Sequence, residues 1–412
     1  MSSHTDSTAS TPLGLSRWRN VPLTLMVVGG LGAVIGAAND PKQFGFSWLL
    51  AFMFFLSLCL GGLFLVLVHH LFDASWSVPI RRITEHLAGL APVMAALFIP
   101  IAILAKQIYP WMGPELQAAP DHALHAKVPL FTVPMFYVVA ALCFGIWWLL
   151  SNRLRYWSLE QDRTGAAEFT YKMRTCSAIG IFLFALTLSL AAIMWMKALQ
   201  HEWFSTMYGV YYFAGSVWTT LATVYVITVV LKRLGPLRDV VHEKQFYFIG
   251  SLLFAFTVFY AYIHFSQYFI IWNANMPEET FWYVLREKGT WWDIGMVIIF
   301  GHFFLPFLTL LRIDVKLSLT IMFPVCAWAW LMHFCDLSFN IMPVLHPDGF
   351  VLHPTDIACF AFICGVVTKA FLKQFNAHPP YPQKDPRFAE ALDVFVPPAP
   401  TAPTAASHGG AK

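Results

Sequence analysis

Residues 46–72 read FSWLLAFMFFLSLCLGGLFLVLVHHLF, and their only ionisable side chains apart from one cysteine are two histidines near the end. A helix needs about 20 consecutive apolar residues to cross the hydrocarbon core of a membrane. Because lipid offers no hydrogen-bond partner, a crossing segment must satisfy its own backbone, as a helix does. This stretch therefore predicts a membrane-spanning helix.

Nine further apolar runs resemble this one in length and composition. The ten predicted spans are Val21–Ala38, Phe46–Phe72, Leu87–Ala105, Val128–Leu150, Thr175–Met196, Met207–Leu231, Phe246–Trp272, Trp291–Leu311, Leu317–Phe334 and Ile357–Leu372. The 412-residue chain is 58% hydrophobic and only 12% charged, about half the charged share of a typical soluble domain. The sequence thus predicts an all-α integral membrane protein with ten transmembrane helices.

The lengths of the connecting segments predict two four-helix bundles. Helices 2–5 (about residues 46–196) would form the first bundle and helices 6–9 (about residues 207–334) the second, with helices 1 and 10 peripheral. Small residues permit close helix approach in membranes. We therefore expect Gly61 and Gly62 to mark a tight helix contact.

Three regions follow from this division. Residues 1–16 would be a polar N-terminal lead, 17–375 the transmembrane domain, and 376–412 a Pro/Ala-rich tail. The composition of the far part of the tail predicts disorder. The aromatic residues of its nearer half suggest docking on a partner.

The basic residues are distributed unevenly between the two sides of the membrane. With these spans, 20 of the 26 Lys and Arg residues fall on the side of the two termini. The six on the opposite side are Lys42, Lys106, Lys127, Lys197, Arg286 and Lys288. Cytoplasmic segments carry the excess of Lys and Arg, so we expect a multi-pass protein with both termini in the cytoplasm.

A first group of ionisable residues lies where helix 2 ends and helix 3 begins. It comprises His69, His70, Asp73, Arg81, Arg82 and Glu85. His69 and Asp73 are four residues apart and share a helix face, and histidine beside a carboxylate exchanges protons near neutral pH. We expect either part of a proton path or an interfacial charge cluster on a short basic turn, residues 73–86.

A second group lies deeper in the second bundle. His302 falls in the middle of helix 8, His264 and Gln267 in the outer half of helix 7, and His333 and Asp336 at the outer end of helix 9. Ionisable groups inside a bilayer cost roughly 2.5–3.5 kcal/mol and are functional candidates.

Because helices 7, 8 and 9 are neighbours in sequence, their polar faces are candidates for one hydrated proton path. Two alternatives remain open: neutral histidines that only join helices by hydrogen bonds, and a haem b held by His264 and His302.

The chain shows no sequence motif for a catalytic or redox centre. Its seven cysteines form no CxxC, CxxCH or ferredoxin-type cluster and are expected to be packing residues. No P-loop, GxSxG, HExxH or dinucleotide fingerprint occurs either. We therefore expect no catalytic residue, no metal and no cofactor bound by this chain alone.

Two stretches resemble a known family. Residues 57–88 read SLCLGGLFLVLVHHLFDASWSVPIRRITEHLA, and residues 265–283 read FSQYFIIWNANMPEETFWY. Together with ten helices in two bundles and a short tail, they resemble the F subunit (ActF) family of bacterial alternative complex III. That family belongs to the wider polysulfide-reductase (NrfD-like) group, and the resemblance covers roughly residues 17–395.

Membership of this family would imply a subunit of a quinol:electron-acceptor oxidoreductase in a bacterial inner membrane, in a respiratory or photosynthetic chain. The expected partners are a related ten-helix subunit, an iron–sulfur subunit, haem c subunits, in some cases a terminal oxidase, and membrane lipids, with no nucleic acid. The F-type subunit is not catalytic alone. It is expected to contribute a proton path, and its contact with quinone stays open.

Two other functions remain as alternatives. A stand-alone secondary transporter or channel often has helices broken by Gly or Pro at matched positions in two halves. The prolines within these spans, Pro100, Pro134, Pro306 and Pro324, are not matched in this way. The third function is a purely structural membrane anchor, in which the polar residues only pack.

Overall fold

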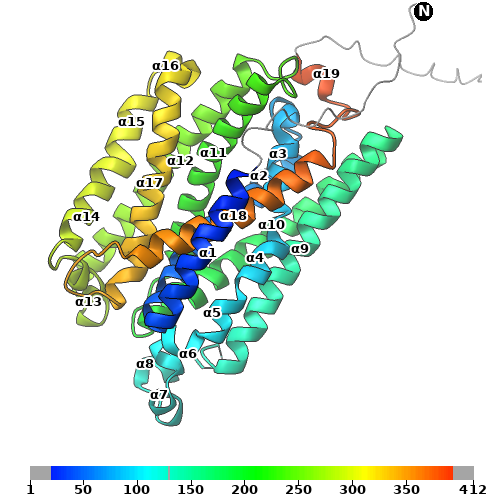
Figure 1. The fold of residues 1–412 in the computed structure, drawn as a ribbon. Coiled ribbons are helices and arrows are strands. Elements are labelled where there is room, and N and C mark those ends of the chain that lie inside the picture. Colours follow the sequence, from blue (N-terminus) through cyan, green and yellow to red (C-terminus); the bar gives the residue numbers. More distant parts are fainter. Residues whose placement is uncertain (1–19, 129, 393–412) are drawn as a thin grey trace, which may run out of the picture.

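The computed structural model describes residues 20–128 and 130–392 (Figure 1). These residues form helices and connecting segments without any β-strand, and ten helical segments are long and apolar enough to cross a membrane. The predicted all-α membrane fold with ten spans is therefore confirmed. The predicted polar lead, residues 1–16, and the far part of the tail lie outside the described residues.

Several spans are composite. The ten spans are α1 (Val21–Asn39), α2 (Pro41–Phe72), η1 with α3, α4 and α5 (Ser75–Ile80, Arg81–Ala88, Ala91–Leu97, Ile99–Ile103), α9 (Val133–Thr164), α10 (Glu168–Trp195), α11 (Tyr208–Leu234), α12 (Glu243–Ala274), α14 with η4 and α15 (Trp291–Val297, Ile298–Phe304, Leu305–Leu310), α17 with η5 (Leu319–Ile341, Met342–Val344) and α18 (Pro354–Asn376). The short helices are α6 (Ala105–Ile108), η2 (Pro110–Met112), α7 (Pro114–Ala118), α8 (His122–His125), η3 (Lys197–Gln200), α13 (Pro277–Arg286), α16 (Ile313–Leu317) and α19 (Phe388–Ala391).

The two predicted bundles are present. The second to fifth spans pack in one ring and the sixth to ninth in another, while α2 and α11 pack against each other and join the rings. Gly61 allows this approach, because a Cβ there would lie 2.8 Å from the carbonyl oxygen of Ser216. Gly62 likewise lets α3 approach α2, since its Cβ would lie 2.7 Å from that of Leu87.

The first and last spans form a separate antiparallel pair. Figure 1 shows α1 and α18 crossing the front of the molecule side by side. Gly29 permits the contact, because a Cβ there would lie 2.7 Å from the carbonyl oxygen of Ala358. The pair packs against the rest of the molecule mainly where α18 contacts α2. It therefore lies at the periphery, as predicted.

We name the two ends of the molecule by their residues. The basic end carries Arg81, Arg174 and Arg387, and the loop end carries α6, α7 and α8 (top and bottom of Figure 1). At the basic end α9 and α10 run well beyond their predicted limits and meet at Gly165, whose φ of 74° ends α9.

The third span begins earlier than predicted. We expected residues 73–86 to form a basic turn, but the chain is helical again from Ser75, and Arg81, Arg82 and Glu85 are buried. The prediction was wrong because these charges neutralise one another inside the protein and do not need water.

The ninth span is longer than predicted and ends at Val344. His333 and Asp336 therefore lie in the interior of α17, not at its outer end. The error arose because the polar residues after Phe334 lowered the hydropathy there, although their side chains face the protein interior.

Candidate functional site

Asp336 is a buried carboxyl group that holds two tyrosines. It lies on α17 with 2% of its surface exposed, and its Oδ1 atom accepts the Tyr260 hydroxyl of α12 at 2.7 Å and the Tyr211 hydroxyl of α11. The two tyrosine oxygens are 3.0 Å apart. None of the ion pairs within residues 20–128 and 130–392 involves Asp336. Three helices thus share one hydrogen-bonded cluster around an unpaired acid.

The cluster continues toward the loop end through Asn340, one turn further along α17. The Asn340 amide donates to the Tyr211 hydroxyl at 3.2 Å and to the carbonyl oxygen of Asp336 at 2.8 Å. Its Oδ1 atom accepts the Tyr208 hydroxyl at 3.0 Å. Hydroxyl and amide groups therefore extend the polar cluster by about one helical turn.

Arg286 closes the loop end of this polar cluster. Its guanidinium is buried, donates to the carbonyl oxygens of Phe339 and Asn340 at 2.8 and 2.9 Å, and lies 3.4 Å from the ring centroid of Trp282. Burial lowers the pKa of Arg286 to about 9. A fixed cation at this position disfavours the entry of other cations.

His302 lies between two aromatic rings. Its imidazole stacks on Trp218 at 3.8 Å and on Tyr260 at 3.7 Å, centroid to centroid, and is fully buried. Neither ring nitrogen has a hydrogen-bond partner among the described residues. A buried polar atom without a partner costs about 1–3 kcal/mol, so this position needs an explanation that packing does not supply.

The backbone around His302 is also unusual. Residues 298–304 form a π-helix, in which the Leu305 N–H donates to the Phe300 carbonyl oxygen. Pro306 follows and has no N–H to donate to the carbonyl oxygen of His302 four residues earlier. Single π-turns of this kind occur frequently at functional sites.

His333 connects this cluster to the first bundle. Its Nε2 atom lies 3.0 Å from the Ser57 hydroxyl on α2, and its Nδ1 atom has no partner within the described part of the chain. Gly215 on α11 leaves room for the ring, because a Cβ there would lie 3.2 Å from Cε1 of His333. The Tyr212 hydroxyl lies 3.2 Å from the Ser57 oxygen.

His264 and Gln267 lie on the loop-end half of α12, as predicted. The His264 ring is 5.8 Å from that of Tyr260 and borders a cavity of about 380 Å³ between α12 and α14. Gln267 accepts the Ser205 hydroxyl at 2.9 Å and donates to the Tyr283 hydroxyl at 3.2 Å. Residues from the seventh, eighth and ninth spans therefore converge, whereas Gln267 belongs to a separate pair of contacts nearer the loop end.

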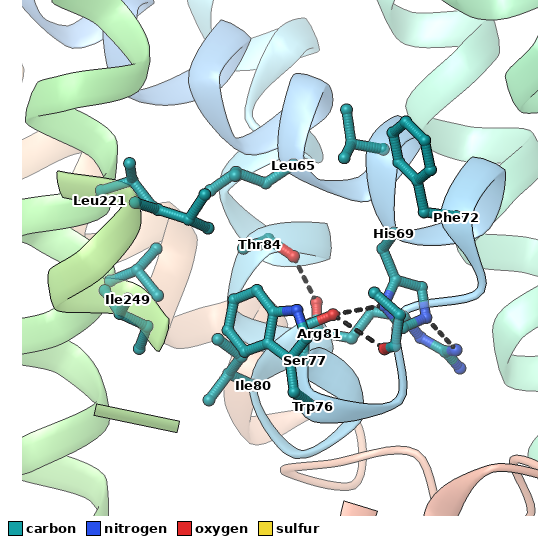
Figure 2. A pocket seen from close by; sticks show the side chains of 14 residues that line it. Leu65, His69, Phe72, Trp76, Ser77, Ile80, Arg81, Thr84, Leu221 and Ile249 are labelled. Atoms are coloured by element: carbon teal, nitrogen blue, oxygen red, sulfur yellow. Dashed lines mark hydrogen bonds between the residues drawn. The ribbon is translucent and has the colours of Figure 1, made fainter. Parts of the chain in front are cut away.

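At the basic end, hydrogen bonds identify the tautomer of His69. Arg81 only donates, so the Nε2 atom of His69, 3.0 Å away, is the acceptor. Nδ1 then carries the proton and donates to the Ser77 hydroxyl at 2.7 Å, which donates to the Ala74 carbonyl oxygen at 3.1 Å. His69 is a neutral, buried relay between an arginine and a serine (Figure 2).

Glu85 lies beneath this relay and is 2% exposed. It accepts Arg81 Nε at 3.1 Å, Arg82 Nη1 at 2.6 Å and the Ser158 hydroxyl at 2.7 Å. Two further carboxylates, Asp385 and Asp162, pair with Arg81 and Arg82 respectively. Charges from the third span, α9 and the C-terminal segment thus compensate one another, which is why they can be buried.

His70 and Asp73 complete the predicted basic-end group. His70 is 3% exposed, its ring lies 4.9 Å from that of His69, and its Nε2 atom has no partner within the described residues. Asp73 ends α2 in a left-handed conformation with φ of 51°, and its carboxylate pairs with Arg174 and Arg387. All six predicted residues of this group therefore lie in one charged cluster.

A cavity of about 270 Å³ extends from this cluster toward the membrane interior. Figure 2 shows His69, Ser77 and Arg81 bonded at one side of it, and Leu65, Leu221 and Ile249 on the other. Beyond it, Thr220 of α11 donates to the carbonyl oxygen of Ser57 at 3.2 Å. Ser57 and His69 are twelve residues apart on α2, which corresponds to about 18 Å.

Sequence reasoning missed several members of both clusters. Tyr211, Asn340 and Arg286 were not singled out. The tyrosine within a predicted span is a visible signal, whereas Asn340 lies beyond the predicted end of the ninth span. Ser57 and Asp385 carried no such signal, since a serine is common in membrane helices and Asp385 lies in the tail.

A third group lies at the loop end. Asp121, His201 and Glu202 offer ligand atoms within 4.8 Å of one another. The same region holds two amines, since Lys127 donates to the carbonyl oxygen of His201 and Lys197 to that of Trp203 at 2.6 Å. His201 Nε2 already bonds Asp121 at 2.7 Å. Nearby ammonium groups and this bond oppose cation binding, so we assign no metal here.

Comparisons with known proteins do not extend this description. No family model matches the chain, and no curated protein matches it significantly.

Proposed function

We propose that this chain is a membrane subunit of a quinol:electron-acceptor oxidoreductase of the alternative complex III type and that it carries protons for that complex. The resemblance of residues 57–88 and 265–283 to the F subunit family supports the assignment. The observation that carries the proton-conducting role is Asp336, an acid at membrane depth that is hydrogen-bonded to Tyr211 and Tyr260 and has no ion-pair partner in residues 20–128 and 130–392. Such groups in membrane proteins mark proton relays.

The proposed path has two polar parts. At the basic end, Asp73, Glu85 and His69 would exchange protons with water. In the interior, the path would run from Ser57 and His333 to the Asp336 cluster. Between them lies the 270 Å³ cavity, whose inner wall is apolar, and water entering this cavity would complete the connection.

Orientation follows from charge. Because the basic end holds the excess of Lys and Arg, the positive-inside rule would put this end and both termini in the cytoplasm, and the family resemblance implies a bacterial cell. Arg286 would then face the outside and oppose the return of protons from that side. In this function the electrons would pass through iron–sulfur and haem c groups of partner subunits.

A second role, contact with the quinone pool, is favoured by the 380 Å³ cavity. Tyr260, His264, Tyr283 and Arg286 are polar residues among those that line it. Aromatic side chains of Trp292, Phe303 and Phe339 supply flat apolar walls. A quinone headgroup has two carbonyl oxygens on a flat ring, so a cavity with hydrogen-bond donors and aromatic walls suits it.

The proton path is tested by Asp336→Asn in the assembly reconstituted in vesicles. Asparagine can still accept the tyrosine hydroxyls but cannot ionise, so we expect quinol-driven proton movement to fall roughly a hundredfold while the complex assembles and transfers electrons. Asp314→Asn is the matched control, because Asp314 is exposed and pairs with Arg312.

If Asp336→Asn moved protons as fast as the unaltered protein, the proton path would be contradicted. The remaining function would then be that of a structural membrane anchor. Purification of the chain alone, without haem-containing partners, would instead favour a stand-alone transporter.

A further inference from the structure

Residues 379–391, which we call the lid segment, fold back onto the basic end. Figure 1 shows its helix, α19, above α3, and α19 packs on η1. Within the segment the rings of Tyr381 and Phe388 stack 5.4 Å apart at 5°. Gln245 of α12 lies 3.5 Å from the carbonyl oxygen of Ala391. The nearer half of the tail, for which we had predicted docking on a partner, is thus seated on the chain itself.

Two side chains of the lid segment reach into the basic-end cluster. The Asp385 carboxylate pairs with Arg81, and these side chains are 8% and 1% exposed. Arg387 lies 3.5 Å from the Asp73 carboxylate and also donates to the Asp73 carbonyl oxygen. The segment therefore contributes an anion to Arg81 and a cation to Asp73, two groups at the entrance of the proposed path.

The lid segment also contacts α9. The backbone N–H groups of Gln383 and Lys384 donate to the Asp162 carboxylate at 2.9 and 3.4 Å. The Lys384 amine donates to the carbonyl oxygen of Arg163 at 3.0 Å. Since Asp162 also pairs with Arg82, the segment is attached to the same charge network on two sides.

Beneath the lid segment lies a cavity of about 190 Å³. Asp385, Pro386 and Arg387 form one part of its wall, and His69, His70 and Val78 form another. His70 Nε2 is buried there without a partner among the described residues. The cavity thus borders both the lid segment and the two histidines, and it is large enough for water.

We propose that the lid segment is a gate that controls the access of water to His69 and His70. In the closed state the pair of Asp385 with Arg81 covers the cavity. Opening exchanges these ion pairs for hydrated charges. Because the desolvation of a buried charge pair offsets much of its attraction, the open state is accessible, although the closed state is by far the more populated one. The role of the gate in proton entry depends on the proposed function, whereas the gate itself does not.

The gate is tested by the labelling of a cysteine placed under the lid. Val78 is 1% exposed and lines the cavity, so Val78→Cys reports opening when the purified full-length protein is treated with a hydrophilic maleimide. Background from the native cysteines is measured on the protein without Val78→Cys. Adding Asp385→Asn should raise the labelling rate about tenfold or more, because a neutral side chain no longer holds Arg81.

Glu390→Gln is the matched control and should leave the rate unchanged, since the Glu390 side chain is 61% exposed. A chain ending at Asn376 should label as fast as Asp385→Asn or faster. Equal labelling in all these proteins, or rapid labelling of Val78→Cys in the otherwise unchanged chain, would overturn the proposal. Faster labelling with unaltered proton uptake supports the gate and contradicts the proton path.

Discussion

The Nε2 atom of His333 lies 3.0 Å from the hydroxyl oxygen of Ser57, and this hydrogen bond joins the two bundles. The Ser57 hydroxyl is also 3.0 Å from the carbonyl oxygen of Met53. When Ser57 donates to that carbonyl, His333 donates from Nε2, and its Nδ1, which has no partner among the described residues, remains a proton acceptor. His333, the titratable residue of the two, can thus accept a proton at Nδ1, which lies near Gly215 of the second bundle.

Replacing Ser57 with alanine should destabilise the protein by about 1–3 kcal/mol, because Nε2 of His333 loses its partner in a buried site. Thermal unfolding in mild detergent measures the effect. Ser177→Ala is the matched control, since the Ser177 hydroxyl is equally buried and has no hydrogen-bond partner among the described residues. If the two variants were equally stable, the hydrogen bond between Ser57 and His333 would not contribute to the free energy of unfolding.

His302→Phe separates a structural from a functional histidine. Phenylalanine keeps an aromatic ring between Trp218 and Tyr260 and loses no hydrogen bond, because neither imidazole nitrogen has one within the described chain. We expect unchanged or higher thermal stability together with reduced proton movement. His302→Ala should instead destabilise the protein by about 3 kcal/mol through the cavity it leaves. Full proton movement in His302→Phe would restrict His302 to packing.

The sequence predicts the spans well because lipid imposes a simple requirement of length and hydropathy. The convergence of His264, His302 and Asp336 is also predictable, since short connections make the seventh, eighth and ninth spans neighbours. The roles of these residues in a proton path stay predictions.

Burial of Arg81 and Glu85 was not predictable in the same way. The two arginines that pair with Glu85 each need a second carboxylate. Asp162 lies 80 residues from Arg82, and Asp385 lies 304 residues from Arg81. A local sequence pattern contains no information about such distant partners. Without them, charged residues spaced as in residues 73–86 are typical of an exposed turn. The hydrogen bond between Ser57 and His333 was not predicted for the same reason, because these two residues are 276 positions apart in the sequence.

Filling the 380 Å³ cavity tests the proposed contact with quinone. Ala261 lines this cavity on α12, so Ala261→Phe should occupy the space and reduce labelling of α12 and α14 by a photoreactive quinone about tenfold, the loss expected when steric overlap removes about 1.4 kcal/mol of binding. Ala141→Phe is the control, because Ala141 is exposed on α9. Labelling that is spread over all helices, or insensitive to Ala261→Phe, would contradict a quinone site here.

The lowered pKa of Lys197 predicts that the stability of the protein depends on pH. It lies at the loop end, outside the spans, and burial followed by the nearby charge of Lys127 lowers its pKa from 10.5 to about 7. Between these two values the unfolded chain binds more protons than the folded protein, so stability should rise with pH by up to about 1.4 kcal/mol per unit.

Below pH 7 the Lys197 amine is charged in both states, and its contribution no longer changes with pH. The measurement is thermal unfolding between about pH 6 and pH 9.5 for the unaltered protein and for Lys197→Met, which keeps a similar side-chain length without the amine. Titrating groups other than its neighbour Lys127 act equally on both proteins, so the difference between the two curves reports Lys197 together with its interaction with Lys127. We expect this difference to favour Lys197→Met most at low pH and to shrink as pH rises, because the buried ammonium is then replaced by a neutral amine that still donates to Trp203. A difference that is constant with pH would mean that Lys197 stays charged in the folded protein.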